Sequence, residues 1–440
     1  MRKTGWWITT LILFIAAFPV LADAPFRAHR FDSMNNLPPH KTGDVVFLGN
    51  SITNMMEWWE ALGAEPSVHN RGNSGAVTPE LIENIDSLIK GDPSKIFVMI
   101  GTNDLALIKE GETTADIAGN IITLLSMIKE KQPAAEIYFQ SILPANRDDR
   151  PHEKTMEING IVENWITENK ADNLEYIDLY SIFIDEAGDL AFSSTTPDSM
   201  SLSFDNLHLT QKGYAKWHRF IEDKVGLKSV LNDTLPNVWG GLKGSTGMRV
   251  THFASFPVLA SDTLLIGDEM IANGEWHELM QSANIKGRGI GWGFPGPTIQ
   301  ELEKAFEPIF KGNAAKGVTK EIPATVGFYA GAADIIKGNT ADVIKQRYDH
   351  ALDSLARLAP SSSLILFTFP EQIARNPQQK DVIEELNVYI LGKAGVSGIR
   401  FIDLYNAIKT DDEPSTWFME EGSPYLSGKG YRKVAALIRD

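Results

Sequence analysis

The sequence predicts an α/β protein of two tandem domains, each built on a parallel β-sheet with helices on both faces. The chain has 440 residues, whereas a single hydrophobic core rarely serves more than about 250–300 residues. Short apolar runs alternate with stretches whose apolar residues recur at helical spacing, a pattern typical of a parallel sheet covered by helices. In addition, segments of the first half recur in the second half in the same order.

The recurrence is clearest around two turns. "VFLGNSITNMMEWWE", which begins at Val46, and "LLIGDEMIANGEWHE", which begins at Leu264, share an apolar run, a glycine and a later Glu-Trp pair without a gap. Four more segments recur at similar offsets: 69–85 with 286–302, 96–110 with 326–339, 176–183 with 401–408, and 205–221 with 422–438. Chance is a poor explanation for repeats in one order, so we infer a tandem duplication.

The domain boundaries are predicted from these repeats. We expect a first domain over 23–227 and a second domain over 248–440. The stretch 228–247 carries Gly, Asn and Pro and breaks the alternating pattern, so it is predicted to be a linker. We expect the two domains to pack against each other, and the sequence leaves the oligomeric state open.

Residues 1–22 have the features of a secretory signal peptide. Two basic residues precede an apolar stretch from Trp6 to about Phe18, and a Val-Leu-Ala sequence ends at Ala22. The alternative is an uncleaved anchor helix, but the apolar run is short for a hydrocarbon core of about 30 Å. The chain has no cysteine for lipid attachment, metal binding or catalysis. The prediction is a periplasmic or secreted protein with no membrane span after cleavage.

The net charge argues against one class of partner, and the spacing of the histidines argues against a metal site. A net charge of −16 argues against a nucleic-acid partner, because nucleic-acid-binding surfaces are usually basic. It favours a neutral small-molecule or glycan substrate. His69, His152 and His218 lack the spacing of metal ligands, so no metal site is predicted.

Strands and helices alternate along the first copy. The predicted buried strands are Val45–Leu48, Ile96–Ile100, Ile137–Ile142 and Leu174–Ile177. Between them, "PELIENIDSLI" and "IAGNIITLLSMIKE" have apolar residues at helical spacing. The stretch "ITNMMEWWEAL" is predicted to be a helix with Trp58 and Trp59 facing the core. Arg71 remains open between a substrate contact and an ion pair with a structural carboxylate.

A serine, a histidine and an aspartate in this frame suggest nucleophilic catalysis. Ser51 lies between a strand end and a helix start, where ligands bind in open parallel sheets. A serine nucleophile needs a base, and the base needs a carboxylate that fixes its tautomer. His208 and Asp205, three residues apart in "DNLHLT", supply that pair. Taken singly, each has a plainer interpretation as a helix-capping serine or a surface loop.

Two further segments supply donors for an oxyanion hole. Gly75 in "NRGNSGAVT" offers a backbone N–H without a side chain in the way, and Asn103 in "GTND" follows the strand Ile96–Ile100 with a side-chain amide. The backbone N–H of Ser51 is a third donor. The plainer alternatives are a turn glycine and an Asx-turn asparagine.

Together, "GNSI", "NRGNSG", "GTND" and "DNLH" resemble the motifs of the SGNH-hydrolase (GDSL-type esterase) superfamily over about 180 residues. In that superfamily the matching positions are the nucleophile, two oxyanion donors, the residue that orients the base, and the base: Ser51, Gly75, Asn103, Asp205 and His208. The resemblance implies a flavodoxin-like three-layer α/β/α fold without metal or cofactor. One position departs from the pattern, because Asn50 stands where the family usually has Asp before the serine.

The resemblance implies an exported serine esterase that removes a small acyl group, expected to be acetyl, from a carbohydrate or similar polar substrate. Two other enzymatic activities remain open, a lysophospholipase and a short-chain acyl thioesterase. A third alternative is a glycan-binding protein without catalytic activity.

The second copy lacks the residues of this chemistry. Glu269 faces Ser51, Ala333 faces Asn103, Tyr425 faces His208, Gly422 faces Asp205, and the counterpart of Gly75 falls near Trp292 or Gly293. We therefore predict a degenerate, inactive SGNH-like domain. It binds a glycan, shapes the substrate entrance of the first copy or mediates dimers, and the sequence does not rank these roles.

Overall fold

A computed structural model describes residues 24–63, 65, 67–169, 172–184, 201–231, 242, 244–291, 293–312, 317–395, 398–420 and 423–439. The predicted signal peptide and most of the predicted linker lie outside these residues, so both remain predictions. No helix in the described part of the chain combines the length and hydrophobicity that a membrane crossing requires.

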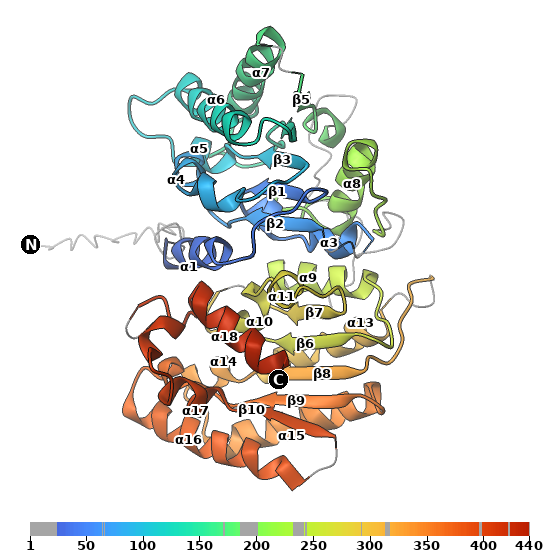
Figure 1. Ribbon diagram of the computed structural model, residues 1–440, viewed down its shortest axis with the longest axis vertical. Coiled ribbons are helices and arrows are strands. Elements are labelled where there is room, and N and C mark those ends of the chain that lie inside the picture. The colour runs from blue at the N-terminus through green and yellow to red at the C-terminus, as the bar shows by residue number, and fades with distance from the viewer. Residues whose placement is uncertain are drawn as a thin grey trace, which may run out of the picture.

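The first half contains a sheet of five parallel strands: β1 (Val45–Gly49), β2 (Val68–Gly72), β3 (Lys95–Met99), β4 (Glu136–Gln140) and β5 (Leu174–Ile177). Their order across the sheet is β2-β1-β3-β4-β5, which is the flavodoxin-like order. The strands are buried because helices cover both faces (Figure 1). The predicted strands therefore lie within a residue or two of the observed ones, and β2 joins them as an edge.

The helices of the first half are α1 (Ala24–Asn35), α2 (Ser51–Asn54), α3 (Trp58–Ala61), α4 (Thr78–Leu88), α5 (Thr102–Ala106), α6 (Thr114–Lys131), α7 (His152–Glu168) and α8 (Gln211–Val225). The single helix predicted after Ser51 is in fact two, α2 and α3. In a continuous helix the Thr53 carbonyl would accept the N–H four residues later. It instead accepts the indole N–H of Trp58 at 2.8 Å, so the chain folds back and buries both Trp58 and Trp59 as predicted.

The second half repeats this architecture. Its strands are β6 (Thr263–Gly267), β7 (Ile285–Gly289), β8 (Thr325–Tyr329), β9 (Ser363–Phe367) and β10 (Ile399–Ile402). Their order, β7-β6-β8-β9-β10, matches that of the first sheet strand for strand, and all pairs are parallel. The helices are α9 (Gly244–Ser255), α10 (Glu269–Asn273), α11 (Trp276–Met280), α12 (Ile299–Glu303), α13 (Phe306–Phe310), α14 (Ala332–Ile336), α15 (Ala341–Leu358), α16 (Pro377–Leu391), α17 (Leu404–Lys409) and α18 (Gly428–Arg439). The chain therefore has the predicted fold of two tandem α/β domains.

Individual contacts recur as well as strand order. The indole of Trp276 donates to the Ile271 carbonyl at 2.8 Å, as that of Trp58 does to Thr53. A Cβ on Gly267 would lie 2.4 Å from the carbonyl oxygen of Tyr329, and one on Gly49 would lie at the same distance from that of Met99. Both positions therefore need glycine, because the next strand passes so close.

The two sheets meet edge to edge, with β2 and β7 facing each other and α1, α3, α9 and α11 between the halves (Figure 1). Arg71 on β2 forms a two-pronged ion pair with Glu278 of α11, at 2.8 and 2.7 Å. Arg288 on β7 forms the reciprocal pair with Glu60 of α3, at 2.6 Å for both contacts. All four side chains are buried. Arg71 therefore serves the interface between the halves.

The same reciprocity extends along the interface. Arg30 of α1 pairs with Glu275 at 2.5 Å, and Arg249 of α9 pairs with Glu57. Trp59 stacks on His277, its own counterpart, with ring centroids 4.5 Å apart and planes 16° apart. In a symmetric dimer, a residue that contacts its own counterpart lies on the twofold axis. The two halves therefore contact each other in the way that the two subunits of a homodimer do.

Candidate active site

Ser51 lies at the first position of α2, directly beyond the end of β1. The side chain of Asn50 caps this helix, since its Oδ1 accepts the backbone N–H of Ile52 at 3.0 Å. The asparagine that departs from the family pattern therefore retains a capping role. The hydroxyl oxygen of Ser51 lies 2.8 Å from Nε2 of His208, which comes from the loop before α8.

Asp205 and His208 form the expected pair within one tight turn. Nδ1 of His208 lies 2.7 Å from Oδ2 of Asp205, while Oδ1 accepts the backbone N–H groups of Leu207 and His208 at 3.1 and 2.7 Å. Burial raises the pKa of the Asp205 carboxyl, but its bonds to His208 and the charge of Arg147 outweigh burial and lower it. An ionised Asp205 holds the Nδ1 proton, so Nε2 of His208 is free to accept the Ser51 proton.

Gly75 and Asn103 lie next to each other at the same edge of the sheet. Gly75 has a φ of +81°, in the region that favours glycine. The Asn103 amide donates to the Ala76 carbonyl at 3.0 Å, which leaves its second amide hydrogen available. Neither the Ser51 nor the Gly75 backbone N–H donates to any residue that the structure describes. Among the described residues, the two predicted backbone donors are therefore unused by the fold, and Asn103 uses one of its two amide hydrogens.

Arg150, in the loop between β4 and α7, controls the orientation of Asn103. Its buried guanidinium donates to Oδ1 of Asn103 and to the hydroxyl of Thr102, both at 3.1 Å. A guanidinium has only donors, so it can hold only the oxygen end of the amide. The nitrogen end of Asn103 must then face Ala76 and the Gly75 turn.

Arg147, three residues earlier in that loop, holds the aspartate. It donates to Oδ2 of Asp205 at 3.0 Å and to the backbone carbonyl of Asp205 at 3.2 Å. The sequence reasoning missed both arginines. The available signal was "NRDDRP" immediately after a predicted strand, because loops at the carboxyl ends of parallel strands meet at one sheet edge.

The equivalent edge of the second half is occupied differently. Glu269 lies at the first position of α10, where α2 has Ser51, and Ala333 replaces Asn103. Tyr425 stands near the place of the base, and its hydroxyl accepts the Phe294 backbone N–H at 3.1 Å. Gly422, the predicted counterpart of Asp205, lies outside the described residues.

The predicted counterpart of Gly75 was wrong, because it is Gly296. Asp104 accepts the backbone N–H of Thr78 at 2.9 Å, three residues after Gly75. Asp334 accepts that of Ile299 at 2.9 Å, three residues after Gly296. Gly296 shares the positive φ, at +71°. The extra residues between β7 and this turn all precede the glycine, which shifts it along the sequence.

In the second half, the backbone N–H that corresponds to that of Gly75 is already hydrogen-bonded. The Gly296 N–H donates to the carbonyl of Gly293 at 2.8 Å. The segment that holds an open N–H in the first half is therefore closed by a backbone hydrogen bond in the second.

Among the described residues, two overlapping groups have atoms close enough to hold a metal ion: His40, Asp44 and His69, and His69, His277 and Glu278. Both include His69 at the interface between the halves. His69 lies 2.9 Å from Asp44 and 3.0 Å from Glu278. Burial lowers the pKa of His69, but the two carboxylates raise it further, to about 9. The counterpart pair is Lys286 with Asp262, at 2.7 Å. A protonated His69 in place of a lysine acts as a cation between carboxylates and offers no lone pair to a metal.

Comparisons with known proteins place the chain near one family of hydrolases. Residues 47–216 match the GDSL-like Lipase/Acylhydrolase family. Platelet-activating factor acetylhydrolase IB subunit alpha2 of Rattus norvegicus is 28% identical over 182 residues, which are 40% of this chain and 73% of the relative. Subunit alpha1 of Homo sapiens is 25% identical over 194 residues, 42% of this chain and 75% of the relative.

Solved structures of similar proteins each cover about half of this chain. A GDSL-like lipase from Bacteroides thetaiotaomicron is 21% identical, with a TM-score of 0.35, and covers 46% of this chain and 98% of its own. An acetylxylan esterase from Geobacillus stearothermophilus is 18% identical, with a TM-score of 0.33, and covers 43% and 95%.

Proposed function

Because residues 47–216 form a GDSL-like lipase/acylhydrolase domain, we propose that this protein is a serine esterase that removes a small acyl group from a polar alcohol. The observation that carries the proposal is the unbroken hydrogen-bond series from Ser51 through His208 to Asp205, at 2.8 and 2.7 Å. Such a series is what an un-ionised serine hydroxyl needs to become a nucleophile near neutral pH.

The geometry implies a two-step reaction. Nε2 of His208 takes the hydroxyl proton as Oγ of Ser51 attacks the ester carbonyl. The resulting oxyanion accepts hydrogen bonds from the backbone N–H groups of Ser51 and Gly75 and from the free amide hydrogen of Asn103. His208 then gives its proton to the departing alcohol. Water, activated by the same imidazole, hydrolyses the acyl-enzyme and restores Ser51.

Each oxyanion donor in such a site contributes about 2.7–4 kcal/mol to the transition state, by analogy with a measured deletion in a serine protease. Asp205 stabilises the imidazolium that forms at His208. Arg147 and Arg150 contact the carboxylate and the amide rather than the substrate, so they are positioning residues.

We propose that the acyl group is acetyl. The sequence relatives named above are acetylhydrolases, which supports a short acyl chain. A carbohydrate alcohol is supported by the predicted export and the acidic composition. The platelet-activating factor named for the relatives favours a second ester substrate, platelet-activating factor itself.

Acetate release separates these substrates. The full chain is incubated with acetylated xylan, with platelet-activating factor, and with p-nitrophenyl acetate and octanoate as matched chromogenic esters. We expect faster turnover of the acetate ester than of the octanoate ester, and acetate release from the glycan. Preference for octanoate would contradict the short acyl group, and release from the lipid alone would contradict the glycan.

The nucleophile is tested in the same preparation. A fluorophosphonate probe should label Ser51 in the wild-type chain and leave Ser51→Ala unlabelled and inactive. Hydrolysis at the wild-type rate by folded Ser51→Ala would refute the assignment.

A further inference from the structure

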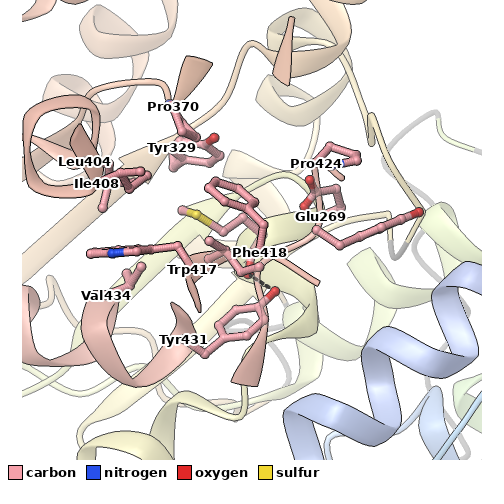
Figure 2. Close-up of a pocket in the computed structure, with 13 residues that line it drawn as sticks. Glu269, Tyr329, Pro370, Leu404, Ile408, Trp417, Phe418, Pro424, Tyr431 and Val434 are labelled. Atoms are coloured by element: carbon pink, nitrogen blue, oxygen red, sulfur yellow. Dashed lines mark hydrogen bonds between the residues drawn. The ribbon is translucent and has the colours of Figure 1, made fainter. Parts of the chain in front are cut away.

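The second half has a pocket at the place where the first half has its candidate active site. Glu269 of α10 lies on its wall, and the other residues come from α10, β8, the segment after β9, α17, the segment before α18, and α18 itself (Figure 2). Five aromatic side chains line it: Tyr329, Trp417, Phe418, Tyr425 and Tyr431. The space inside is about 10 Å³, which is room for about one group of the size of a water molecule.

Glu269 has no partner among the residues that the structure describes. Its side chain is 5% exposed, and no described hydrogen bond or ion pair reaches its carboxyl group. Asp268, the adjacent residue, is fully buried. The backbone N–H groups of Met270 and Ala332 approach the Asp268 carboxyl, but both of its oxygens lack a hydrogen bond of normal geometry. Two buried carboxyls therefore lie side by side without a cation.

Comparison with the first half shows that these carboxyls are an addition. The corresponding residues there, Asn50 and Ser51, are neutral. The nearby arginines are already paired elsewhere, since Arg347 binds Asp334 and Arg30 binds Glu275. Burying an unpaired carboxylate is costly, and buried charges in proteins are normally paired. No cation among the described residues forms an ion pair with Asp268 or Glu269, and Arg375, in the loop before α16, lies over the ring of Phe294 instead.

The titratable groups that face Glu269 from the surrounding elements supply no positive charge either. They are Asp268, Asp334, Tyr329, Tyr425 and Tyr431, together with His29 of α1, which stacks on Tyr425. Burial holds the pKa of His29 at about 3, so it is neutral. Burial raises the pKa of both Asp268 and Glu269, and the charges of Asp334 on Asp268 and of Asp268 on Glu269 raise them further, so a cation that enters the pocket favours loss of a proton.

We propose that this pocket binds the head group of a primary organic ammonium, with Glu269 as its counter-ion and the aromatic side chains around it. An –NH₃⁺ group is close to a water molecule in size, and aromatic rings attract such cations through their π faces. The Tyr329 hydroxyl, which has no described hydrogen bond, is available as an acceptor. On binding, Glu269 releases its proton to solvent, so one cation enters and one proton leaves.

Saturation-transfer difference NMR on the full chain tests the proposal, with ethylammonium chloride as the probe at pH 6, 7 and 8. Because binding releases a proton, we expect affinity to rise about tenfold per pH unit while pH stays below the pKa of Glu269. Ethanol and potassium chloride are matched controls for the neutral shape and for a bare cation. Neither should compete with ethylammonium.

The variant Glu269→Gln keeps the shape of the side chain and should abolish binding. Glu307→Gln, at an exposed position on α13, is the control and should bind as the wild type does. Absence of saturable binding, equal competition by ethanol or potassium, or pH-independent affinity would overturn the proposal. The pH series needs no variant, so it decides the matter even if Glu269→Gln fails to fold.

The site does not depend on the proposed esterase activity. Ethylammonium binding is measured directly, and Ser51→Ala should leave it unchanged. A protein that hydrolyses esters but binds no ammonium would refute only this inference.

Discussion

The turn after β1 and the turn after β6 have the same backbone and different chemistry. Both follow a glycine pressed against the next strand, and both begin a short helix that an indole N–H closes. In the first half that helix presents Ser51 to an imidazole, whereas in the second it presents an unpartnered Glu269 to a set of aromatic rings. The fold therefore does not require the reactive residues, and they can be changed while the frame is kept.

The largest effect on activity should come from substitutions at Ser51 and Glu269, the residues that begin the two short helices. Ser51→Ala is expected to reduce kcat on the order of 10⁶-fold, as loss of the serine does in a serine protease. Adding Glu269→Ser to that variant should restore nothing, because the second half has Ala333 and Tyr425 where the amide and the base would be needed. Hydrolysis of p-nitrophenyl acetate measures both variants, and rescue by Glu269→Ser would show that the second edge is still competent.

The buried ion pairs at the interface allow the contribution of Glu278 to stability to be compared with that of Glu60. Glu278→Gln removes the carboxylate that pairs with Arg71 and one of the two that flank His69, while Glu60→Gln affects only Arg288. Breaking a buried pair by removing one partner costs about 3–5 kcal/mol, and we expect Glu278→Gln to cost the more of the two in urea unfolding. The exposed pair of Glu307 with Lys311 is the control, and Glu307→Gln should leave the urea midpoint unchanged, because solvent screens the pair. Equal losses for all three variants would contradict the assigned roles.

The variant Asn103→Ala compares the two halves at the candidate active site. It gives the first half an alanine where the second half has Ala333. Loss of one oxyanion donor should lower kcat about 10²–10³-fold with little change in KM. The melting temperature should stay close to the wild type, because Ala333 is accommodated in the same frame. An unchanged kcat would remove Asn103 from the oxyanion hole.

The halves should also differ in how pH affects the interface. His69 occupies the place of Lys286, and its pKa is raised to about 9 from an unfolded value near 6.5. Its contribution to stability is fully present below about pH 6.5 and is lost as pH rises through about 9, a change of roughly 3 kcal/mol for a shift of that size. Urea unfolding between pH 6 and 10 measures it. His69→Lys should flatten the loss, because lysine stays charged over this range; a wild-type profile flat to pH 10 would contradict the raised pKa.

The strands and helices could be predicted from the sequence because their apolar residues recur at a regular spacing. Strand and helix patterns, together with the repeated segments, predicted two tandem parallel sheets, and they placed four strands of the first sheet within a residue or two. Side chains that reach across the molecule carry no such period. Arg71 was ambiguous because its partner, Glu278, lies about 200 residues away in the other half. Gly296 was misplaced because the residues inserted before it have no counterpart that marks where they end.

The smallest predicted effect concerns Arg150, which the sequence did not single out. Arg150→Met removes the bond that faces the Asn103 oxygen, so the amide can turn and present the wrong end to the oxyanion. A hydrogen bond to a charged group contributes about 1.5–3 kcal/mol, and since only part of this reaches the transition state we expect kcat to fall about tenfold with KM unchanged. Arg150→Lys, which keeps a donor, should recover part of the loss.

A double-mutant cycle separates this positioning role from general damage to the fold. In the Asn103→Ala background there is no amide left to orient, so Arg150→Met should have little further effect on kcat. In the second half, Ala333 offers no amide to orient. Arg375, in the equivalent loop, lies over the ring of Phe294 instead, 5.5 Å from its centroid. If the two losses instead multiply, Arg150 acts on the reaction by a route that does not pass through Asn103.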